Sequence, residues 1–342
     1  MTDFYEHHHI VVDKGQELLR IDRYLQQHLA SVSRTKIQAA AKSSCVLVNE
    51  KAVKPNYRVK PGDVISVVLP EPPQEIELIP EDIPLSIVYE DDDVLVVDKQ
   101  AGLVVHPGYG NTHGTLLNAL LYYFQGKKDS DGNAIQPFLV HRIDKDTTGL
   151  LLVAKNEPAQ VVLAKQFFEH TIEREYAALV WGDFEEESGT VDLRIGRSPK
   201  DRRIMTVYPY DEMLSEDEQP GKRAVTHWRV VERFGYVTLV ACNLETGRTH
   251  QIRTHLRHIG HPLFNDVAYG GGEILKGTTF SKYKQFVENC FQLLPRQALH
   301  ARILGFEHPS TGKHLHFESP IPADMDAVLS RWRNYAANSV KL

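Results

Sequence analysis

Cysteine is scarce in this sequence, and long apolar runs are missing altogether. Only three cysteines, Cys45, Cys242 and Cys290, occur among 342 residues, and they are far apart. An odd number of widely spaced cysteines excludes a disulfide framework and a zinc knuckle, so we expect buried, unpaired thiols. No apolar run is long enough to cross a bilayer, and the N-terminus lacks the basic start and apolar stretch of a secretory signal. We therefore expect a cytoplasmic protein without a membrane partner.

A basic excess is also missing, because the formal net charge is −6. Taken alone, this value argues against a nucleic-acid partner. The charge is unevenly distributed, however. Residues 16–70 hold nine Lys or Arg against four acidic residues, a balance of +5, whereas residues 71–98 hold no Lys or Arg. The first segment therefore has the charge of a nucleic-acid-binding module, and the negative charge is concentrated elsewhere.

Length and the change in charge together predict two domains. In residues 16–75, a helical spacing, a second helix capped by Ser33 and two strand-like runs predict a small α/β module with a basic face. Its candidate nucleic-acid contacts are Arg23, Arg34, Lys36 and Lys42. Residues 1–15 form an N-terminal extension. Residues 76–84, in an acidic stretch rich in proline, form a solvated linker.

Residues 85–342 contain many strand-like runs and few helical ones. Strands are predicted at 86–90, 94–99, 138–143, 149–155, 176–182, 226–234, 236–244, 301–309 and 313–319. Helices are predicted at 116–125, 158–170 and 249–258. Strands outnumber helices and their connections are short, so we expect an α+β domain on a mixed, mostly antiparallel sheet. Residues 209–222 and the segment from 270 to 294 have the composition of surface insertions.

Five chargeable side chains precede the apolar run LLLVA (150–154), in the stretch HRIDKDTTG (141–149). They could simply cap a buried strand. A calcium loop starting at Asp144 fails, because its twelfth position is Lys155 rather than a bidentate Glu. Asp144 and Asp146 could be a glycosidase pair. Alternatively, Asp144 is a lone nucleophilic carboxylate that Arg142 and Lys145 keep ionised.

A second polar group lies in residues 244–262, which read as a strand end, a glycine turn and a helix. Thr249 is the candidate N-cap and Gly260 the candidate stop. Arg253 lies away from the predicted apolar face, and Arg248 lies at the helix N-terminus, where backbone amides favour phosphate. The histidines at 250, 255, 258 and 261 lack the spacing of a zinc site. A solvated basic helix remains the alternative.

These residues match a known family. HRIDKDTTG resembles the signature loop of the RluA-type pseudouridine synthases, and the module at 16–75 resembles the S4 RNA-binding domain that often precedes their catalytic domain. Three further segments are similar to later family motifs: REYAAL (174–179), ETGRTHQIRTHL (245–256) and RQALHA (296–301). The matches cover residues 16–322 in the family's order. Ile143 stands where the family has Leu, and Ser44 and Glu50 stand where it often has glycine.

The resemblance implies a role for each matched residue. Asp144 would be the catalytic aspartate, Arg253 its ion-pair partner and Tyr176 the ring that stacks on the target base. Arg142 would enter the RNA stack that the flipped uridine has left, and Leu299 would line the pocket. His141 and Arg248 would join Arg142 and the basic residues of the first module in binding RNA.

The resemblance also implies the reaction and the partner. We expect a monomeric isomerase that converts specific uridines of large-subunit ribosomal RNA, free or in a precursor particle, to pseudouridine. The reaction transfers no electrons and no external group, so no cofactor and no metal are expected. Whether Asp144 attacks the sugar or the base, or deprotonates the ribose, is open. A non-catalytic ribosome-assembly factor and a glycoside hydrolase using Asp144 and Asp146 are the alternatives.

Overall fold

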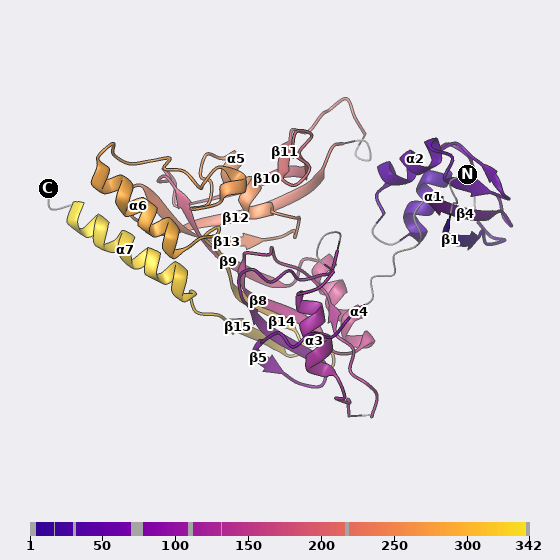
Figure 1. Ribbon diagram of the computed structural model, residues 1–342, viewed down its shortest axis with the longest axis horizontal. Coiled ribbons are helices and arrows are strands. Elements are labelled where there is room, and N and C mark those ends of the chain that lie inside the picture. Colours follow the sequence, from indigo (N-terminus) through magenta and orange to yellow (C-terminus); the bar gives the residue numbers. More distant parts are fainter. Residues whose placement is uncertain are drawn as a thin grey trace. The chain divides into compact units, whose positions relative to one another are not determined.

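A computed structural model gives the structure of the chain and describes residues 5–16, 18–29, 32–69, 78–108, 112–130, 132–215 and 219–339. The chain divides into two compact units, Met1–Glu77 and Leu78–Leu342 (Figure 1). Within the described ranges, no helix is both long and apolar enough to span a membrane. The three cysteines are buried and unpaired, as the sequence predicts.

The first unit packs two helices on a small sheet. Its elements are β1 (Tyr5–Val11), α1 (Ile21–His28), α2 (Arg34–Lys42), β2 (Val46–Val48), β3 (Lys51–Ala52) and β4 (Val64–Leu69). The sheet order is β1-β4-β2-β3. Both predicted helices are confirmed, and the Ser33 side chain accepts from the Lys36 amide as the predicted cap. The strand β1 was not predicted; it pairs antiparallel with β4, so part of the expected N-terminal extension belongs to this sheet.

Two turns of the first unit hold side-chain-bearing residues in the left-handed region. Ser44 and Glu50, the positions where the resembling family often has glycine, have φ angles of 60° and 66°. Asn49 beside them has a φ of 49°. This conformation is strained for residues with a Cβ and unstrained for glycine. The backbone at Ser44 and Glu50 therefore adopts the conformation that glycine favours, although neither residue is glycine.

The second unit is built on one mixed sheet of eleven strands. The strands are β5 (Ser86–Glu90), β6 (Val94–Lys99), β7 (Phe138–Leu139), β8 (Thr148–Ala154), β9 (Glu173–Trp181), β10 (Ser188–Arg197), β11 (Met205–Tyr208), β12 (Lys222–Arg233), β13 (Val237–Leu244), β14 (Leu299–Glu307) and β15 (His314–Glu318). The main path runs β11-β10-β12-β13-β9-β14-β8-β6-β5. β8 and β14 pair in parallel and the other neighbours along this path pair antiparallel. The α+β prediction is therefore confirmed; β10 and β11 were not predicted.

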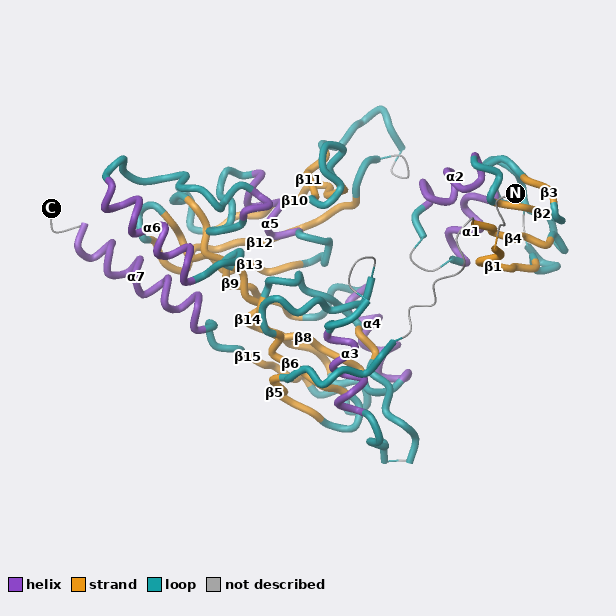
Figure 2. The backbone as a smooth tube through the Cα atoms, viewed as in Figure 1, coloured by secondary structure: helices purple, strands orange, loops and turns teal. Residues whose placement is uncertain are grey.

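Helices lie against this sheet, as Figures 1 and 2 show. They are α3 (Leu116–Phe124), α4 (Glu157–Phe168), α5 (Gln251–His258), the short η1 (Val267–Tyr269), α6 (Ser281–Leu293) and α7 (Ala323–Ser339). The residues of β9 alternate between two cores: Ala178 and Val180 face one, while Leu179 and Trp181 face the other. The first core extends to Leu299 and becomes the floor of the site described below.

The segment 270–294 is not a surface insertion, contrary to the sequence prediction. Tyr283, Val287 and Cys290 of α6 are buried in the second core. Trp332 of α7 is fully buried in the same core. Polar residues between the apolar positions of α6 led to the prediction of a solvent-exposed segment. The helix α7 was not predicted. The other expected insertion, 209–222, is described except at residues 216–218.

The segment 78–84 is docked rather than free. Glu81 donates through its amide to the Asn118 carbonyl, and the Asn118 side chain donates to the Ile79 carbonyl. The Glu81 carboxylate accepts from the Gly114 amide at the start of α3. Most of the predicted linker, 76–84, is therefore held to the second unit rather than solvated. Residues 76 and 77 of this linker lie outside the described residues.

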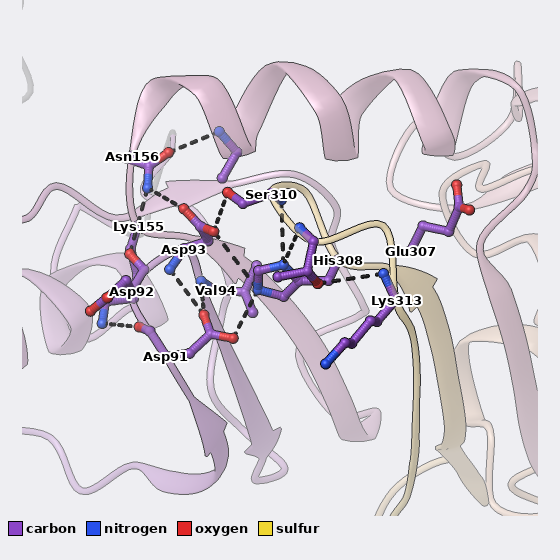
Figure 3. Close-up of polar contacts among 12 residues, drawn as sticks. Asp91, Asp92, Asp93, Val94, Lys155, Asn156, Glu307, His308, Ser310 and Lys313 are labelled. Carbon is purple, nitrogen blue, oxygen red and sulfur yellow. Dashed lines mark hydrogen bonds and ion pairs between the residues drawn. The ribbon is translucent and has the colours of Figure 1, made fainter.

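A polar network fixes the strand ends farthest from the site (Figure 3). His308 Nε2 lies 2.9 Å from Asp91 Oδ2, and Ser310 Oγ bonds to Asp93. Lys155 donates to the Asp91 carbonyl. The turn between β5 and β6 is thereby joined to the turn after β14 and to the end of β8. These contacts join the ends of the central strands that lie opposite the site.

Candidate active site

The loop that precedes β8 lies where the parallel strands β8 and β14 begin side by side. In their register, Thr148 pairs with His300 and Gly149 with Ala301. Gly149 has a φ of 113°, and a Cβ there would lie 2.1 Å from the Ala301 carbonyl oxygen. Only glycine permits this approach. The Thr-Thr-Gly turn therefore brings the charged loop 141–147 against the start of β14, next to Leu299.

The buried Lys99 holds this loop in place through hydrogen bonds to backbone carbonyls. Lys99 Nζ donates to the carbonyls of Gln100, Leu103 and Lys145 at 2.8, 2.9 and 2.9 Å. Burial lowers the pKa of Lys99 to about 8, although the charges of Asp146 and Asp144 act in the opposite direction. The carbonyl of Lys145 directly follows Asp144 in the chain. Lys99 thus fixes the backbone that carries Asp144.

The Asp144 carboxylate is paired with Arg253 of α5, as the resemblance implies. Arg253 Nη1 donates to Asp144 Oδ2 at 3.1 Å. The other edge of the same guanidinium is bidentate on Asp266, with Nε–Oδ2 at 2.7 Å and Nη2–Oδ1 at 2.9 Å. Burial alone would lower the pKa of Arg253, but Asp266 and Asp144 raise it. Asp266 therefore orients the cation that faces Asp144.

The start of α5 differs from the prediction. The helix begins at Gln251, and the N-cap is His250, whose φ is 53° and whose side chain makes no cap hydrogen bond. Thr249 is therefore not the cap. The Gln251 side chain instead accepts from the Arg248 amide at 2.9 Å. The left-handed turn directs the His250 ring to the Tyr269 hydroxyl, 2.8 Å from Nδ1, and places Nε2 3.9 Å from Asp144.

Apolar side chains form the walls of the cleft around Asp144. They come from β9, β14, α5 and the loop: Tyr176, Leu299, Ile252 and Ile143. Tyr176 is 8% exposed and Leu299 is 4% exposed. Burial raises the pKa of Tyr176, so its hydroxyl stays protonated at neutral pH. The Asp144 side chain keeps 17% of its surface exposed and can be reached from the cleft.

Three further arginines line the cleft, and they have different surroundings. Arg142 and Arg248 are exposed. Arg174 is 8% exposed, and its Nη2 donates to the carbonyls of Leu244 and Glu245. Its Nε has no hydrogen-bond partner, and among the described residues Arg174 has no carboxylate partner. The cleft therefore holds more positive than negative charge, which suits a polyanion.

His141 packs against α4 and holds the loop to β8. Its ring stacks on Phe167 with centroids 4.7 Å apart, and its Nε2 accepts from the Leu152 amide at 2.8 Å. Burial lowers the pKa of His141 to about 3, so the ring stays neutral. His141 therefore anchors the loop to β8 through Nε2. Its contact with RNA stays a prediction.

The basic residues predicted in the first unit are not equivalent. Arg23, Lys36 and Lys42 are exposed. Arg34 donates to the fully buried Asp22 at 3.1 Å. Burial would raise the pKa of Asp22, but hydrogen bonds from Arg20, Gln38 and Arg34 lower it to about 2. Arg34 therefore contributes to the fold of the unit as well as to its charge.

Several residues that line or support the cleft were not predicted. Lys99 lies at the end of an apolar strand, Asp266 lies in an irregular segment after α5, and Arg174 was quoted in a motif without a role. Lys99 could have been identified from its place at the end of a buried strand, because a buried ammonium group needs hydrogen-bond acceptors. Asp266 carried no such signal, because its contact with Arg253 depends on the fold of residues 259–266.

The histidines of residues 250–261 are not gathered around a common point. His255 is buried against Thr226, and His261 lies beside the Trp181 carbonyl. In the described part of the chain, the one group of His, Cys, Asp or Glu with ligand atoms close enough for a metal ion lies elsewhere, at Glu173, His314 and His316.

Comparison with known proteins gives a consistent result. Residues 93–258 match the family described as RNA pseudouridylate synthase, and residues 19–65 match the S4 domain. An uncharacterized RNA pseudouridine synthase of Chlorobaculum parvum is 48% identical over 94% of this chain and 96% of its own length. The ribosomal large subunit pseudouridine synthase D of Nitrosomonas europaea is 44% identical over 94% of this chain and 87% of its own.

A further relative is the protein of the same name in Escherichia coli K12, which is 42% identical over 94% of this chain and 93% of its own. Among solved structures, the human RNA pseudouridylate synthase domain containing 4 aligns with a TM-score of 0.54 at 23% identity, over 72% of this chain and 93% of its own, which supports the fold. The long, full-length identities agree with the loop, the paired Asp144 and the S4-like unit. The chain belongs to the RNA pseudouridine synthase family, of the RluA type with an N-terminal S4 domain.

Proposed function

We propose that this enzyme converts specific uridines of large-subunit ribosomal RNA to pseudouridine, acting on a flipped-out nucleotide through the carboxylate of Asp144. The observation that carries the proposal is the pairing of a reachable Asp144 with Arg253 at 3.1 Å, inside a cleft walled by Tyr176 and Leu299. The RNA class is inferred from the relatives named ribosomal large subunit pseudouridine synthase D.

The reaction sets clear demands on the site. The bond between N1 of uracil and C1′ of ribose breaks, the base turns, and C5 bonds to C1′, while C5 loses its proton and N1 gains one. A carboxylate can attack C1′, attack the base or remove a ribose proton. Each of these first steps starts from an ionised Asp144. Arg253 balances its charge, and Asp266 keeps Arg253 in place without occupying Asp144.

The cleft suits a base that has left its helix. A stacked uridine cannot reach Asp144, so it must flip, at a cost of a few kcal/mol that is smallest in loops. Tyr176 offers a ring face for the detached uracil, and Leu299 on the neighbouring strand β14 adds to the same apolar lining. Arg142 is exposed at the cleft, where it can take the vacated place in the stack. Phosphate contacts by Arg248 and the first unit would offset the flipping energy.

The decisive experiment compares Asp144→Asn with Asp146→Asn as the matched control. Among the described residues, the cleft lining includes Asp144 but not Asp146. We expect Asp144→Asn to lower pseudouridine formation by at least about 10³-fold while RNA affinity is retained. Asp146→Asn should keep most of the activity. Carbodiimide labelling and primer extension on ribosomal RNA from a deletion strain, complemented with each variant, would locate the uridines.

Other outcomes separate the alternatives. Modification that survives in Asp144→Asn, or the absence of modification by the wild-type enzyme on any ribosomal RNA, would support a non-catalytic assembly factor. Release of free uracil, with loss of activity in both aspartate variants, would support a hydrolase that uses the two carboxylates. Activity on transfer RNA alone would keep Asp144 in its role but overturn the proposed substrate class.

A further inference from the structure

Two histidines and a glutamate converge on the sheet face formed by β9, β14 and β15. His314 and His316 are two residues apart on β15, so both side chains project from the same face. His316 pairs across the ladder with Gly305 of β14, and Gly305 pairs with Glu173 of β9. The three side chains, two from β15 and one from β9, therefore meet over Gly305 of the intervening strand β14.

Gly305 is what allows this convergence. A Cβ at Gly305 would lie 2.5 Å from Glu173 Oε2 and 3.3 Å from His314 Cε1. The space that a side chain would fill is taken by the Glu173 carboxylate, which reaches across β14 toward β15. Because Gly305 is not at a positive φ, its own backbone does not demand glycine. Glycine is required here because the Glu173 and His314 side chains approach its Cα closely.

The distances fit a tetrahedral metal ion. His316 Nδ1 lies 3.1 Å and His314 Nε2 lies 3.9 Å from Glu173 Oε2. All three ligand atoms lie within 4.8 Å of one another. Ligand atoms about 2.1 Å from a tetrahedral Zn²⁺ are about 3.4 Å apart, so small rotations of these exposed side chains would close the site. In the described part of the chain, the ion pairs of Glu173 are with these two imidazoles.

We propose that Glu173, His314 and His316 form a binding site for a divalent transition-metal ion, with Zn²⁺ as the preferred occupant. Two imidazoles and one carboxylate are a ligand set that Zn²⁺ takes, and three protein ligands leave a fourth position for water. The bound ion would connect β9 directly to β15 across β14. Glu173 is three residues from Tyr176 in β9, so the ion would stiffen the strand that supplies the stacking ring.

The test uses the full-length protein and two probes, Co²⁺ and Zn²⁺ alone. Because His7, His8 and His9 are adjacent in the chain and could bind metal separately, all variants are made in a background with these three changed to Asn. The three cysteines are buried and do not compete. Titration with Co²⁺ should give the visible absorption of a tetrahedral site, saturating at one ion per chain and abolished by Zn²⁺.

Each ligand is then removed in turn. Glu173→Gln and His316→Asn should weaken Co²⁺ binding by about tenfold or more. Gly305→Ala should weaken it as well although all three ligands remain, because the added Cβ takes the carboxylate's space. The matched control is His227→Asn, which breaks an exposed His–Glu pair with His227 Nε2 2.7 Å from Glu245 Oε1 and should leave Co²⁺ binding unchanged.

Thermal unfolding gives an independent measurement. Zn²⁺ should raise the unfolding midpoint of the background protein and of His227→Asn, but not that of His316→Asn, because an ion that binds only the folded state stabilises it. The proposal is overturned if the background protein shows no tetrahedral Co²⁺ spectrum with the ion in excess. It is equally overturned if His316→Asn and Glu173→Gln bind Co²⁺ as tightly as the background.

Discussion

Asp266 holds Arg253 by both carboxylate oxygens, at 2.7 and 2.9 Å, and leaves only Nη1 of the guanidinium for Asp144. We predict that Asp266→Asn lowers kcat by about 10- to 100-fold with little change in KM, because the cation loses its fixed orientation. Single-turnover rates on a ribosomal RNA fragment measure this effect. Asp192→Asn, which removes an exposed partner of Arg223, should have no effect. An unchanged kcat in Asp266→Asn would mean that Arg253 needs no such support.

We predict that titration of Lys99 raises folding stability and lowers activity over the same pH range. Its pKa is lowered in the folded protein from 10.5 to about 8, so the unfolded chain holds this proton more tightly. Between these pH values the contribution of Lys99 to folding stability therefore rises with pH. Activity should fall over the same range, because a neutral amine has only two N–H groups for three carbonyls.

The measurement is kcat/KM against pH in wild type and in Lys99→Met. The wild type should lose activity above about pH 8 as Lys99 is deprotonated. Lys99→Met should be slower at every pH and lack this limb. Lys165→Met, at an exposed position on α4, is the control and should keep the wild-type profile. If kcat/KM of Lys99→Met still falls above about pH 8, the titration belongs to another group.

Lys42 and Arg34 should respond differently to loss of charge. Lys42 is exposed, so Lys42→Gln should weaken RNA binding, reduce its salt dependence by about one unit of slope and leave single-turnover rates at saturating RNA unchanged. Arg34→Gln should also destabilise the first unit, because Arg34 is paired with the buried Asp22. Binding isotherms at several salt concentrations test both. Equal salt slopes for wild type and Lys42→Gln would place Lys42 outside the RNA contact.

Glycine should stabilise the first unit when it replaces residues that have positive φ angles. Ser44→Gly and Glu50→Gly each relieve backbone strain at φ near 60°, and after the entropy of glycine is counted we expect a gain of about 0.5–1 kcal/mol each. Hydrogen exchange of amides in α2 and β2 of the full-length protein reports the change. Ser43→Gly is the control, because Ser43 has a φ of −87° and should not gain stability.

The strands and helices that could be predicted were those with a strong local pattern. The run at 150–154 is buried along its whole length, and Ser33 caps α2 as its position before the helix suggests. Errors occurred where long-range contacts overrule local pattern. α6 reads as polar but is packed by the second core, and the α5 cap is set by the left-handed turn at His250 rather than by Thr249.

The sequence by itself determined the family resemblance and the division into a basic module and a second, larger domain. The resemblance, which rests on short motifs, singled out Asp144, Tyr176 and Arg253 as candidate site residues. Only the tertiary structure decided that Asp266 holds Arg253, that Lys99 holds the backbone next to Asp144, that His141 anchors its loop to β8, and that Glu173 meets His314 and His316. The parallel pairing of β8 with β14 and the fold of residues 259–266 create these contacts, and no short segment of sequence encodes distances between strands so far apart in the chain.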